Sequence, residues 1–239
     1  MVDAEGADGG GALARLRGEI VGCRACPRLV AWREAAATHP PASFAGEPYW
    51  AKPLPGFGEE AARLVLVGLA PAAHGGNRTG RMFTGDRSGD FLFAALFRAG
   101  FANQSEGRRL DDGLRLRDAY VTAAVRCAPP DNKPSPEERD RCGGYLAREL
   151  SLLDNARVYL ALGAFAYEAL ARTPPLAGAL TGRRPRFAHG IEMPLGGSDH
   201  PRWLLCSYHP SQRNVFTGLL TAAMFDDVLE RAKKLLDSG

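Results

Sequence analysis

Four of the five cysteines have a spacing that could bind a metal centre. Cys23 and Cys26 form a CxxC that Pro27 follows, while Cys127 and Cys142 lie far along the chain. A CxxC places two thiolates on one side of a tight turn, and ligands from elsewhere complete a tetrahedral set. Ligation by cysteine alone suits Zn²⁺ or an iron–sulfur cluster. The spacing leaves both open, together with the simpler interpretation of four unrelated buried thiols.

Other roles for the cysteines fit the sequence less well. An intracellular chain does not favour disulfides. A redox CxxC lies between a strand and a helix that begins directly after it, and we predict no helix at that point. Cys206 lies within the apolar run 203–207, so we predict that it belongs to the core.

Two loops carry an acid and an imidazole. Asp86 lies in the glycine-rich loop 69–89, and His209 directly follows an apolar run. The glycines allow a ligand to approach the backbone closely, although the loop has neither a Walker nor a dinucleotide-binding spacing. Each residue also has a structural interpretation. Asp86 could cap the helix that follows it, and His209 could serve only as a hydrogen-bonding residue.

A third loop, 126–135, carries Asn132 between two prolines and an adjacent lysine. The asparagine amide both donates and accepts hydrogen bonds, so it could recognise the edge of a base. Asparagine is also a common turn residue, which is an equally good interpretation of this position.

The elements that position these loops follow from the hydrophobic pattern. Short continuous apolar runs predict strands buried on both faces, at 63–68, 119–125, 157–162 and 203–207. Between and around them we predict helices at 12–21, 90–99, 135–153, 164–171 and 217–236, and an ordered loop at 33–58. Strands separated by helices indicate an α/β fold with a mostly parallel, four-stranded sheet covered on both faces.

This fold class predicts where a ligand binds. In parallel sheets, ligands bind at the loops that leave the carboxyl ends of the strands. The loops 69–89, 126–135 and 208–216 all leave such ends, and the unusual residues of the chain are concentrated in them. We therefore expect the three loops to converge on one site.

The composition is that of a globular protein. The chain has 239 residues, 45% of them hydrophobic and 24% charged, which fits one domain at 12–239 after a flexible tail at 1–11. With no apolar run of membrane-spanning length and no secretory signal at the start, we expect a cytoplasmic protein. The net charge of +3 permits nucleic-acid binding without requiring it. Arginine supplies nearly all the basic residues and suits phosphate contacts, although a coding bias explains it equally well.

Taken together, the loops resemble the uracil-DNA glycosylase superfamily, specifically its family 5. The resemblance covers nearly the whole chain from about residue 12 to 236. The segments that carry it are GLAPAAHGGNRTGRMFTGD at 68–86, VTAAVRCAPPDNKP at 121–134, YHPSQRN at 208–214, CRACPRLVAWRE at 23–34 and GEPYWAKPLPGFG at 46–58.

The resemblance implies a fold, a cofactor and an activity. The fold is a three-layer α/β/α sandwich. The four cysteines at 23, 26, 127 and 142 would hold a [4Fe-4S] cluster, with zinc as the alternative. The activity would be hydrolysis of the N-glycosidic bond of a flipped-out uracil in double-stranded DNA, leaving an abasic site. Other deaminated bases such as hypoxanthine are expected substrates, and we expect a monomer.

The resemblance also implies roles for individual residues. His209 would donate a hydrogen bond to the departing base, Asp86 would position water, and Asn132 would contact the base or the water. Phe83 would stack on the base. The remaining pocket residues would be Ala70, Pro71, Ala72, His74 and Gly75, and the DNA contacts would be Arg78, Lys133, Ser211, Gln212, Arg213 and Asn214.

The chain departs from the pattern of most superfamily members, as family 5 does. The second and third positions of the first motif are Leu69 and Ala70 rather than polar or acidic residues, and Ala123 stands where a neighbouring family has an asparagine that pairs with uracil. These departures imply a looser pocket. Competing hypotheses are a metal-stapled nucleic-acid-binding module without chemistry, a protein that traps uracil covalently through a histidine, and a small-molecule nucleosidase.

Overall fold

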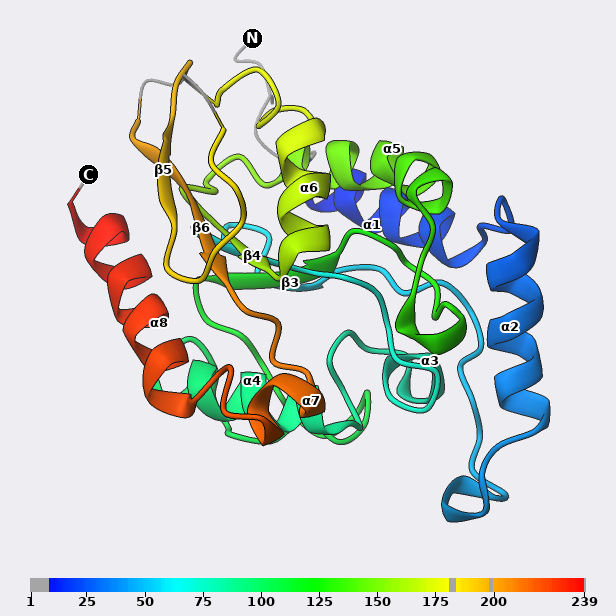
Figure 1. The fold of residues 1–239 in the computed structure, drawn as a ribbon. Coiled ribbons are helices and arrows are strands. Elements are labelled where there is room, and N and C mark those ends of the chain that lie inside the picture. The colour runs from blue at the N-terminus through cyan, green and yellow to red at the C-terminus, as the bar shows by residue number, and fades with distance from the viewer. Residues whose placement is uncertain (1–8, 181–183, 198–199, 239) are drawn as a thin grey trace, which may run out of the picture.

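A computed structural model describes residues 9–180, 184–197 and 200–238. Its centre is a six-stranded sheet with the strand order β1-β3-β2-β4-β6-β5 (Figure 1). The strands are β1 (Phe57–Gly58), β2 (Leu64–Gly68), β3 (Ala119–Ala123), β4 (Val158–Leu162), β5 (Glu192–Leu195) and β6 (Arg202–Ser207). The four inner strands are parallel, which confirms the predicted α/β sheet.

The prediction of four strands was wrong at the sheet edges. β1 and β5 pair antiparallel with β3 and β6 and make six strands in all. β1 has only two residues, and β5 contains the exposed Pro194. Edge strands of this kind lack a continuous apolar run, so periodicity alone does not reveal them.

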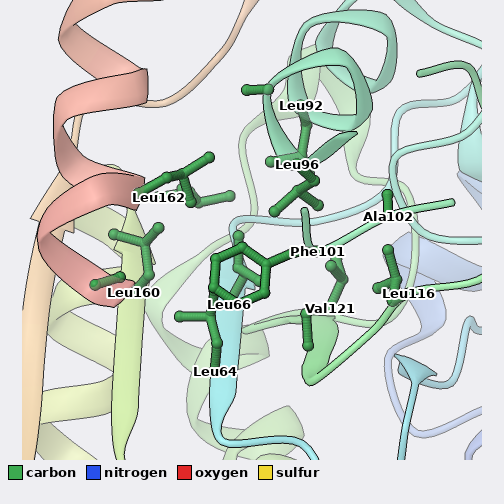
Figure 2. Close-up of a cluster of buried hydrophobic side chains, with 14 of the residues drawn as sticks. Leu64, Leu66, Leu92, Leu96, Phe101, Ala102, Leu116, Val121, Leu160 and Leu162 are labelled. Atoms are coloured by element: carbon green, nitrogen blue, oxygen red, sulfur yellow. The ribbon is translucent and has the colours of Figure 1, made fainter. Parts of the chain in front are cut away.

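Helices cover both faces of the sheet. One face packs against α1 (Gly9–Val21), α5 (Pro136–Leu152) and α6 (Ala164–Arg172), and the other against α4 (Arg87–Arg98) and α8 (Ala222–Asp237) (Figure 1). Alternate residues of each strand enter opposite cores. Leu64 and Leu66 of β2 meet Leu92 and Leu96 of α4 (Figure 2), while Val65 packs on the other face. The apolar runs were therefore correctly interpreted as strands buried on both faces.

The chain is more helical than predicted near its ends. α2 (Pro27–Thr38) extends into the start of the segment 33–58 that was predicted as a loop, and the 3-10 turn η1 (Ala42–Phe44) lies inside that segment. α7 (Gln212–Phe216) lies within the predicted loop 208–216, and the final helix predicted at 217–236 is α8, which begins later, at Ala222. Short turns complete the loops at α3 (Gly76–Thr79) and η2 (Pro130–Asn132). Residues 9–11 of the predicted tail belong to α1, and the rest of that tail lies outside the described residues.

The sequence predicted one of two further helices, α5, and missed the other, α2. α2 has little hydrophobic asymmetry and an exposed Trp32, so helical periodicity did not reveal it. α5 begins as predicted at Ser135, whose side chain and that of Glu138 form a reciprocal capping box. No described helix has the length and apolar character needed to cross a bilayer.

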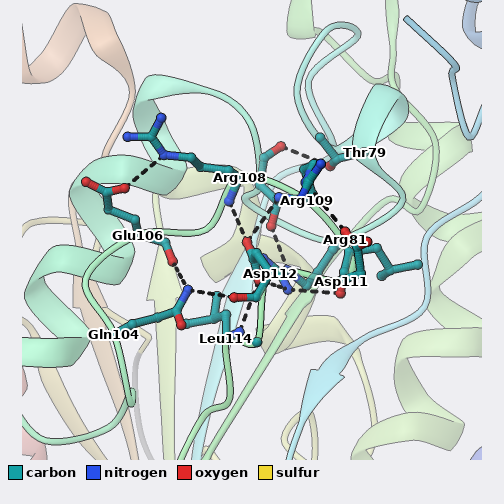
Figure 3. Close-up of polar contacts among 12 residues, drawn as sticks. Thr79, Arg81, Gln104, Glu106, Arg108, Arg109, Asp111, Asp112 and Leu114 are labelled. Carbon is teal, nitrogen blue, oxygen red and sulfur yellow. Dashed lines mark hydrogen bonds and ion pairs between the residues drawn. The ribbon is translucent and has the colours of Figure 1, made fainter.

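A buried ion pair holds the glycine-rich loop in place. Arg81 is 3% exposed and donates two hydrogen bonds to Asp112, at 2.9 and 2.7 Å (Figure 3). Asp112 also accepts from the backbone N–H groups of Arg108, Arg109 and Leu114. Burial by itself would raise the pKa of Asp112, but these donors outweigh it and lower the pKa well below its ordinary value.

Replacing Asp112 with alanine should lower the free energy of unfolding by about 3–5 kcal/mol, because it leaves the Arg81 guanidinium buried without its partner. Urea denaturation of both proteins measures the difference. The neighbouring Asp111→Ala is the matched control, since that side chain is 82% exposed. The contribution of Asp112 should be present above its ordinary pKa and be lost as the pH falls below it. Equal stabilities of the two variants would contradict this role.

Candidate active site

The three polar loops converge on one cavity, as predicted. It has a volume of about 490 Å³ and lies at the carboxyl edge of the parallel strands. Each loop contributes to its wall, and both Asp86 and His209 face it. The lining residues are Leu69, Ala70, Pro71, Ala72, Met82, Phe83, Asp86, Arg87, Ser88, Asn132, His209, Ser211, Gln212 and Arg213.

Asp86 both caps a helix and lines the cavity. It is the N-cap of α4, and its Oδ1 accepts a hydrogen bond of 3.0 Å from the N–H of Gly89. Burial raises the pKa of this carboxyl above its ordinary 3.8. Gly75 makes the position possible, because a Cβ there would lie 2.0 Å from Asp86 Oδ2. The structural interpretation of Asp86 is therefore correct but incomplete.

His209 is fixed in the wall by the turn that follows β6. The Asn214 side chain donates a 2.9 Å hydrogen bond to the His209 carbonyl. Within the described part of the chain, no protein group hydrogen-bonds to the His209 ring nitrogens, which leaves them for a ligand. Burial lowers the pKa of His209 from 6.5 to about 4. The imidazole is therefore neutral near pH 7, with one nitrogen as donor and the other as acceptor.

Phe83 is held in a strained backbone conformation beside His209. Its φ is +52°, which is unusual for a bulky residue, and such strain is concentrated at functional sites. The rings of Phe83 and His209 lie 6.0 Å apart at an angle of 29°. Gly68 makes room for Phe83, because a Cβ at that position would meet the ring at 2.6 Å. The Phe83 ring thus lines the cavity beside the imidazole.

Asn132 reaches the cavity from the third loop. Asp131 and Asn132 have φ of +53° and +54° in η2, a conformation that asparagine and aspartate adopt more readily than most residues. Asn132 is exposed in this structure, so its amide is accessible to a ligand. The turn interpretation and the base-contact hypothesis are therefore compatible.

Some predicted residues lie outside this cavity. His74 and Gly75 line a second, adjacent cavity of about 570 Å³. Arg78 is engaged within the protein: it bonds to the carbonyls of His74 and Gly85 and pairs with Glu47. The prediction that Arg78 contacts phosphate therefore finds no support in this geometry.

The other five predicted DNA contacts divide into three groups. Ser211, Gln212 and Arg213 line the first cavity. Lys133 is exposed but lines neither cavity. Asn214 holds the backbone of His209, so its observed role is internal.

Sequence reasoning missed several lining residues. Leu69, Met82, Arg87 and Ser88 belong to the glycine-rich loop and the start of α4, and their position beside Ala70, Phe83 and Asp86 was the available signal. Trp32 and Phe44 line the second cavity. No local pattern connects them with the loops, because only the tertiary fold brings α2 and η1 alongside.

The four predicted ligand cysteines gather at one place. Cys26, Cys127 and Cys142 are each 8% exposed and share a cluster with Leu29 and Val125. Cys23 is close enough for its charge to raise the pKa of the thiols of both Cys127 and Cys142, to which burial makes the larger contribution. Cys206 is fully buried in β6, as predicted. A helix does begin directly after the CxxC, contrary to our prediction, although the element directly before it is the helix α1 and not a strand.

Two basic side chains flank this cysteine group. Arg33 is buried, and its Nη1 donates to Cys127 Sγ at 3.0 Å while its Nε has no partner. Arg126 forms a fully buried pair with Glu149, at 2.6 Å between Nη2 and Oε2. This pair and the cysteines join the end of β3 to α5. Within the described residues, no three or more His, Cys, Asp or Glu side chains are placed to hold a metal ion.

Comparison with known proteins identifies the family of this chain. The family model described as the uracil DNA glycosylase superfamily matches residues 55–233. Three similar proteins are each named type-5 uracil-DNA glycosylase. The one from Thermus thermophilus is 53% identical over 90% of this chain and 94% of its own length. The one from Mycobacterium tuberculosis is 51% identical over 96% and 84%, and the one from Pyrobaculum aerophilum is 43% identical over 89% and 88%. The chain therefore belongs to the uracil DNA glycosylase superfamily, in its type-5 family.

Proposed function

We propose that this protein excises uracil from DNA by hydrolysing the N-glycosidic bond of a flipped-out nucleotide, leaving an abasic site for repair. One observation carries the proposal: His209 and Asp86, from loops far apart in the chain, line a single cavity together with Phe83, whose ring stacks on that of His209. A stacked base is inaccessible, so it must leave the duplex to reach such a cavity. The substrate proposed is double-stranded DNA, bound by a monomer.

His209 stabilises the leaving base. When the C1′–N1 bond breaks, its electron pair passes to the uracil ring and charge develops on O2. A neutral imidazole donates a hydrogen bond to that oxygen, and its pKa of about 4 keeps it neutral at physiological pH. A donor already in place in a buried site stabilises such charge without reorganising. The departing uracil anion then takes a proton from solvent.

Asp86 acts on the other product of bond breakage, the cationic sugar. Its carboxylate stabilises positive charge at C1′ and orients the water whose oxygen forms the new bond there. The proton released by that water passes to the carboxylate or to solvent. The Gly89 amide holds one oxygen, which fixes the group within the wall. Its buried setting strengthens the interaction with the sugar cation.

The remaining lining residues bind the base and the strand. Phe83 stacks on the flipped base, and Asn132 hydrogen-bonds to its edge or holds the water. Ser211, Gln212 and Arg213 approach the strand beside the vacated stack, and Lys133 contacts phosphate. Leu69 and Ala70 supply an apolar wall with few polar groups. This wall supports acceptance of other deaminated bases such as hypoxanthine.

A single-turnover assay tests the proposal. The protein in excess over a duplex that carries one uracil should release free uracil and leave an alkali-labile abasic site. The same duplex with thymine is the control, and free deoxyuridine tests for a nucleosidase. A DNA-binding module without chemistry would bind the duplex and release no base, and that result would refute the proposal.

The cysteine group is suited to a [4Fe-4S] cluster held by Cys23, Cys26, Cys127 and Cys142. Four sulfur donors without histidine match this cofactor. A single zinc ion bound by the same four thiolates is the alternative. The buried Arg33 guanidinium, with one nitrogen lacking a partner, supplies a cation beside anionic ligands. When bound, the cluster joins α2, β3 and α5, and we propose that its role is structural.

Replacing Cys127 with alanine should abolish the brown colour and visible absorption of the fresh protein, because one of four ligands is lost. The protein should also unfold at a lower temperature, since metal binding contributes directly to folding. Absorption spectra together with iron and sulfide analysis of protein purified without oxygen provide the measurement. Cys206→Ala is the control and should keep both colour and iron. Loss of colour in both variants, or in neither, would contradict the assignment.

A further inference from the structure

A second cavity lies directly beside the proposed active site. It has a volume of about 570 Å³ and shares Ala72, Asp86, Arg87, Asn132 and Gln212 with the first cavity. Its outer wall comes from α2, η1 and the turn before α3, to the right of α7 in Figure 1. A group bound in the first cavity therefore has a neighbouring compartment within reach of the atoms attached to it.

The wall of this cavity is aromatic. Phe44 stacks on His74 with centroids 6.0 Å apart, and the Tyr49 hydroxyl bonds to His74 Nδ1 at 2.9 Å. The Arg78 guanidinium covers the Phe44 ring at 4.3 Å. Trp32 differs from this packed group. It is 37% exposed, and within the described residues no ring contact or hydrogen bond engages its indole. Its aromatic face is thus accessible to a planar ligand.

The charges on the wall select which part of a nucleic acid can enter. Three carboxylates line the cavity, those of Asp86, Asp90 and Asp131, against the single guanidinium of Arg87. This excess of negative charge disfavours a phosphate here. The edge of a base, with its amino and imino donors, would be attracted to the same oxygens. A metal ion is not favoured, since the described acidic residues form no group that could hold one.

Trp32 is firmly anchored although its ring is free. It lies on α2, which begins at Pro27 directly after the CxxC. The next residue, Arg33, donates to Cys127 Sγ, and its carbonyl accepts from Asn77 Nδ2 at 3.1 Å. The cysteine group and the glycine-rich loop therefore both fix the helix that presents the indole. Such anchoring lowers the conformational cost of stacking a base.

We propose that this second cavity binds the nucleobase of the nucleotide next to the excised one in the same strand, with that base stacked on Trp32. This inference rests on the proposed glycosylase function. Successive nucleotides of one strand are about 3.4 Å apart along the duplex axis, and the two cavities are adjacent, with five lining residues in common. The neighbouring base must leave the stack to enter, so the contribution should be largest in single-stranded DNA.

The test measures binding and uses a substrate that is not cleaved. A single-stranded oligonucleotide carries 2′-fluoro-deoxyuridine, whose electron-withdrawing fluorine opposes formation of the sugar cation. The base on its 5′ side, its 3′ side, or neither, is replaced by an abasic analogue. Dissociation constants are measured for the intact protein, Trp32→Ala and Trp32→Phe. Phe97→Ala is the matched control, an exposed aromatic residue of α4 that lines neither cavity.

For the intact protein, one of the two abasic replacements should weaken binding about tenfold, within the range of base–aromatic stacking. Trp32→Ala should bind the complete oligonucleotide equally weakly and show no further loss when that base is missing. Trp32→Phe should restore most of the affinity, and Phe97→Ala should behave as the intact protein. The proposal would be overturned if the abasic replacement weakened binding to Trp32→Ala as much as binding to the intact protein. It would also be overturned if neither abasic replacement weakened binding to the intact protein.

An excision assay distinguishes failure of the base subsite from failure of the proposed function. At saturating enzyme, Trp32→Ala should still release uracil, since Trp32 does not line the first cavity. Failure of the intact protein to release uracil refutes the glycosylase assignment. Normal release without coupling to Trp32 refutes the base subsite alone.

Discussion

His209→Ala should reduce the single-turnover rate of uracil excision by about 10²–10³-fold, the usual cost of removing one donor to a developing oxyanion. Binding of uracil-containing DNA should change little, because the donated hydrogen bond strengthens only as the bond breaks. Single-turnover rates at saturating enzyme, together with dissociation constants for the uncleaved 2′-fluoro substrate, separate the two quantities. Weaker binding with an unchanged rate at saturating enzyme would instead indicate that His209 only holds the base.

The pH dependence gives an independent check on the same residue. With a pKa of about 4, the imidazole is already neutral at pH 5 and remains so as the pH rises. The excision rate should therefore show no step at 6.5, the ordinary histidine value. A rate that fell as the pH rose through 6.5 would mean that a charged imidazole acts, contrary to the mechanism above.

The same pKa determines whether the free energy of unfolding rises or falls with pH. Between about pH 4 and 6.5 the unfolded state binds a proton at His209 and the folded state does not. The contribution of this residue to stability is therefore complete above pH 6.5 and decreases as the pH falls through that window. His209→Asn removes the titrating group and should flatten this part of the stability profile, measured by urea denaturation at a series of pH values.

Asp86→Asn should lower the single-turnover excision rate by orders of magnitude while the protein stays folded. Asparagine is about as good an N-cap as aspartate, so the hydrogen bond from the Gly89 amide is kept while the negative charge is lost. The difference in rate between this variant and the natural protein then measures the effect of the charge alone. Asp86→Ala, which loses both, should be as inactive and also less stable by about 1 kcal/mol.

Stability distinguishes chemistry from capping at this residue. Burial raises the pKa of Asp86 above 3.8, so the ionised form is disfavoured in the folded state. Asp86→Asn removes that cost, and its free energy of unfolding at pH 7 should equal or exceed that of the natural protein. The natural enzyme should lose activity as the pH falls through the raised pKa. An Asp86→Asn variant with full activity would show that Asp86 acts only as a helix cap.

Much of the molecule was predictable from local sequence. The four continuous apolar runs predicted the parallel strands, because a strand covered on both faces has no polar side to interrupt it. The connections between them predicted a common edge for three loops, and the cavity lies there. The spacing of the CxxC and the two later cysteines suggested one group of thiols, and Cys26, Cys127 and Cys142 do share a cluster.

The tertiary structure decided what local patterns could not express. α2 has no marked apolar face, because its buried residues include Arg33, which contacts Cys127 and Asn77 rather than a hydrophobic core. The internal roles of Arg78 and Asn214 depend on partners that only folding brings near. The pKa changes of Asp86 and His209 likewise come from burial by residues distant in the chain. The sequence determines which chemical groups are present, and long-range packing determines their solvation, partners and orientation.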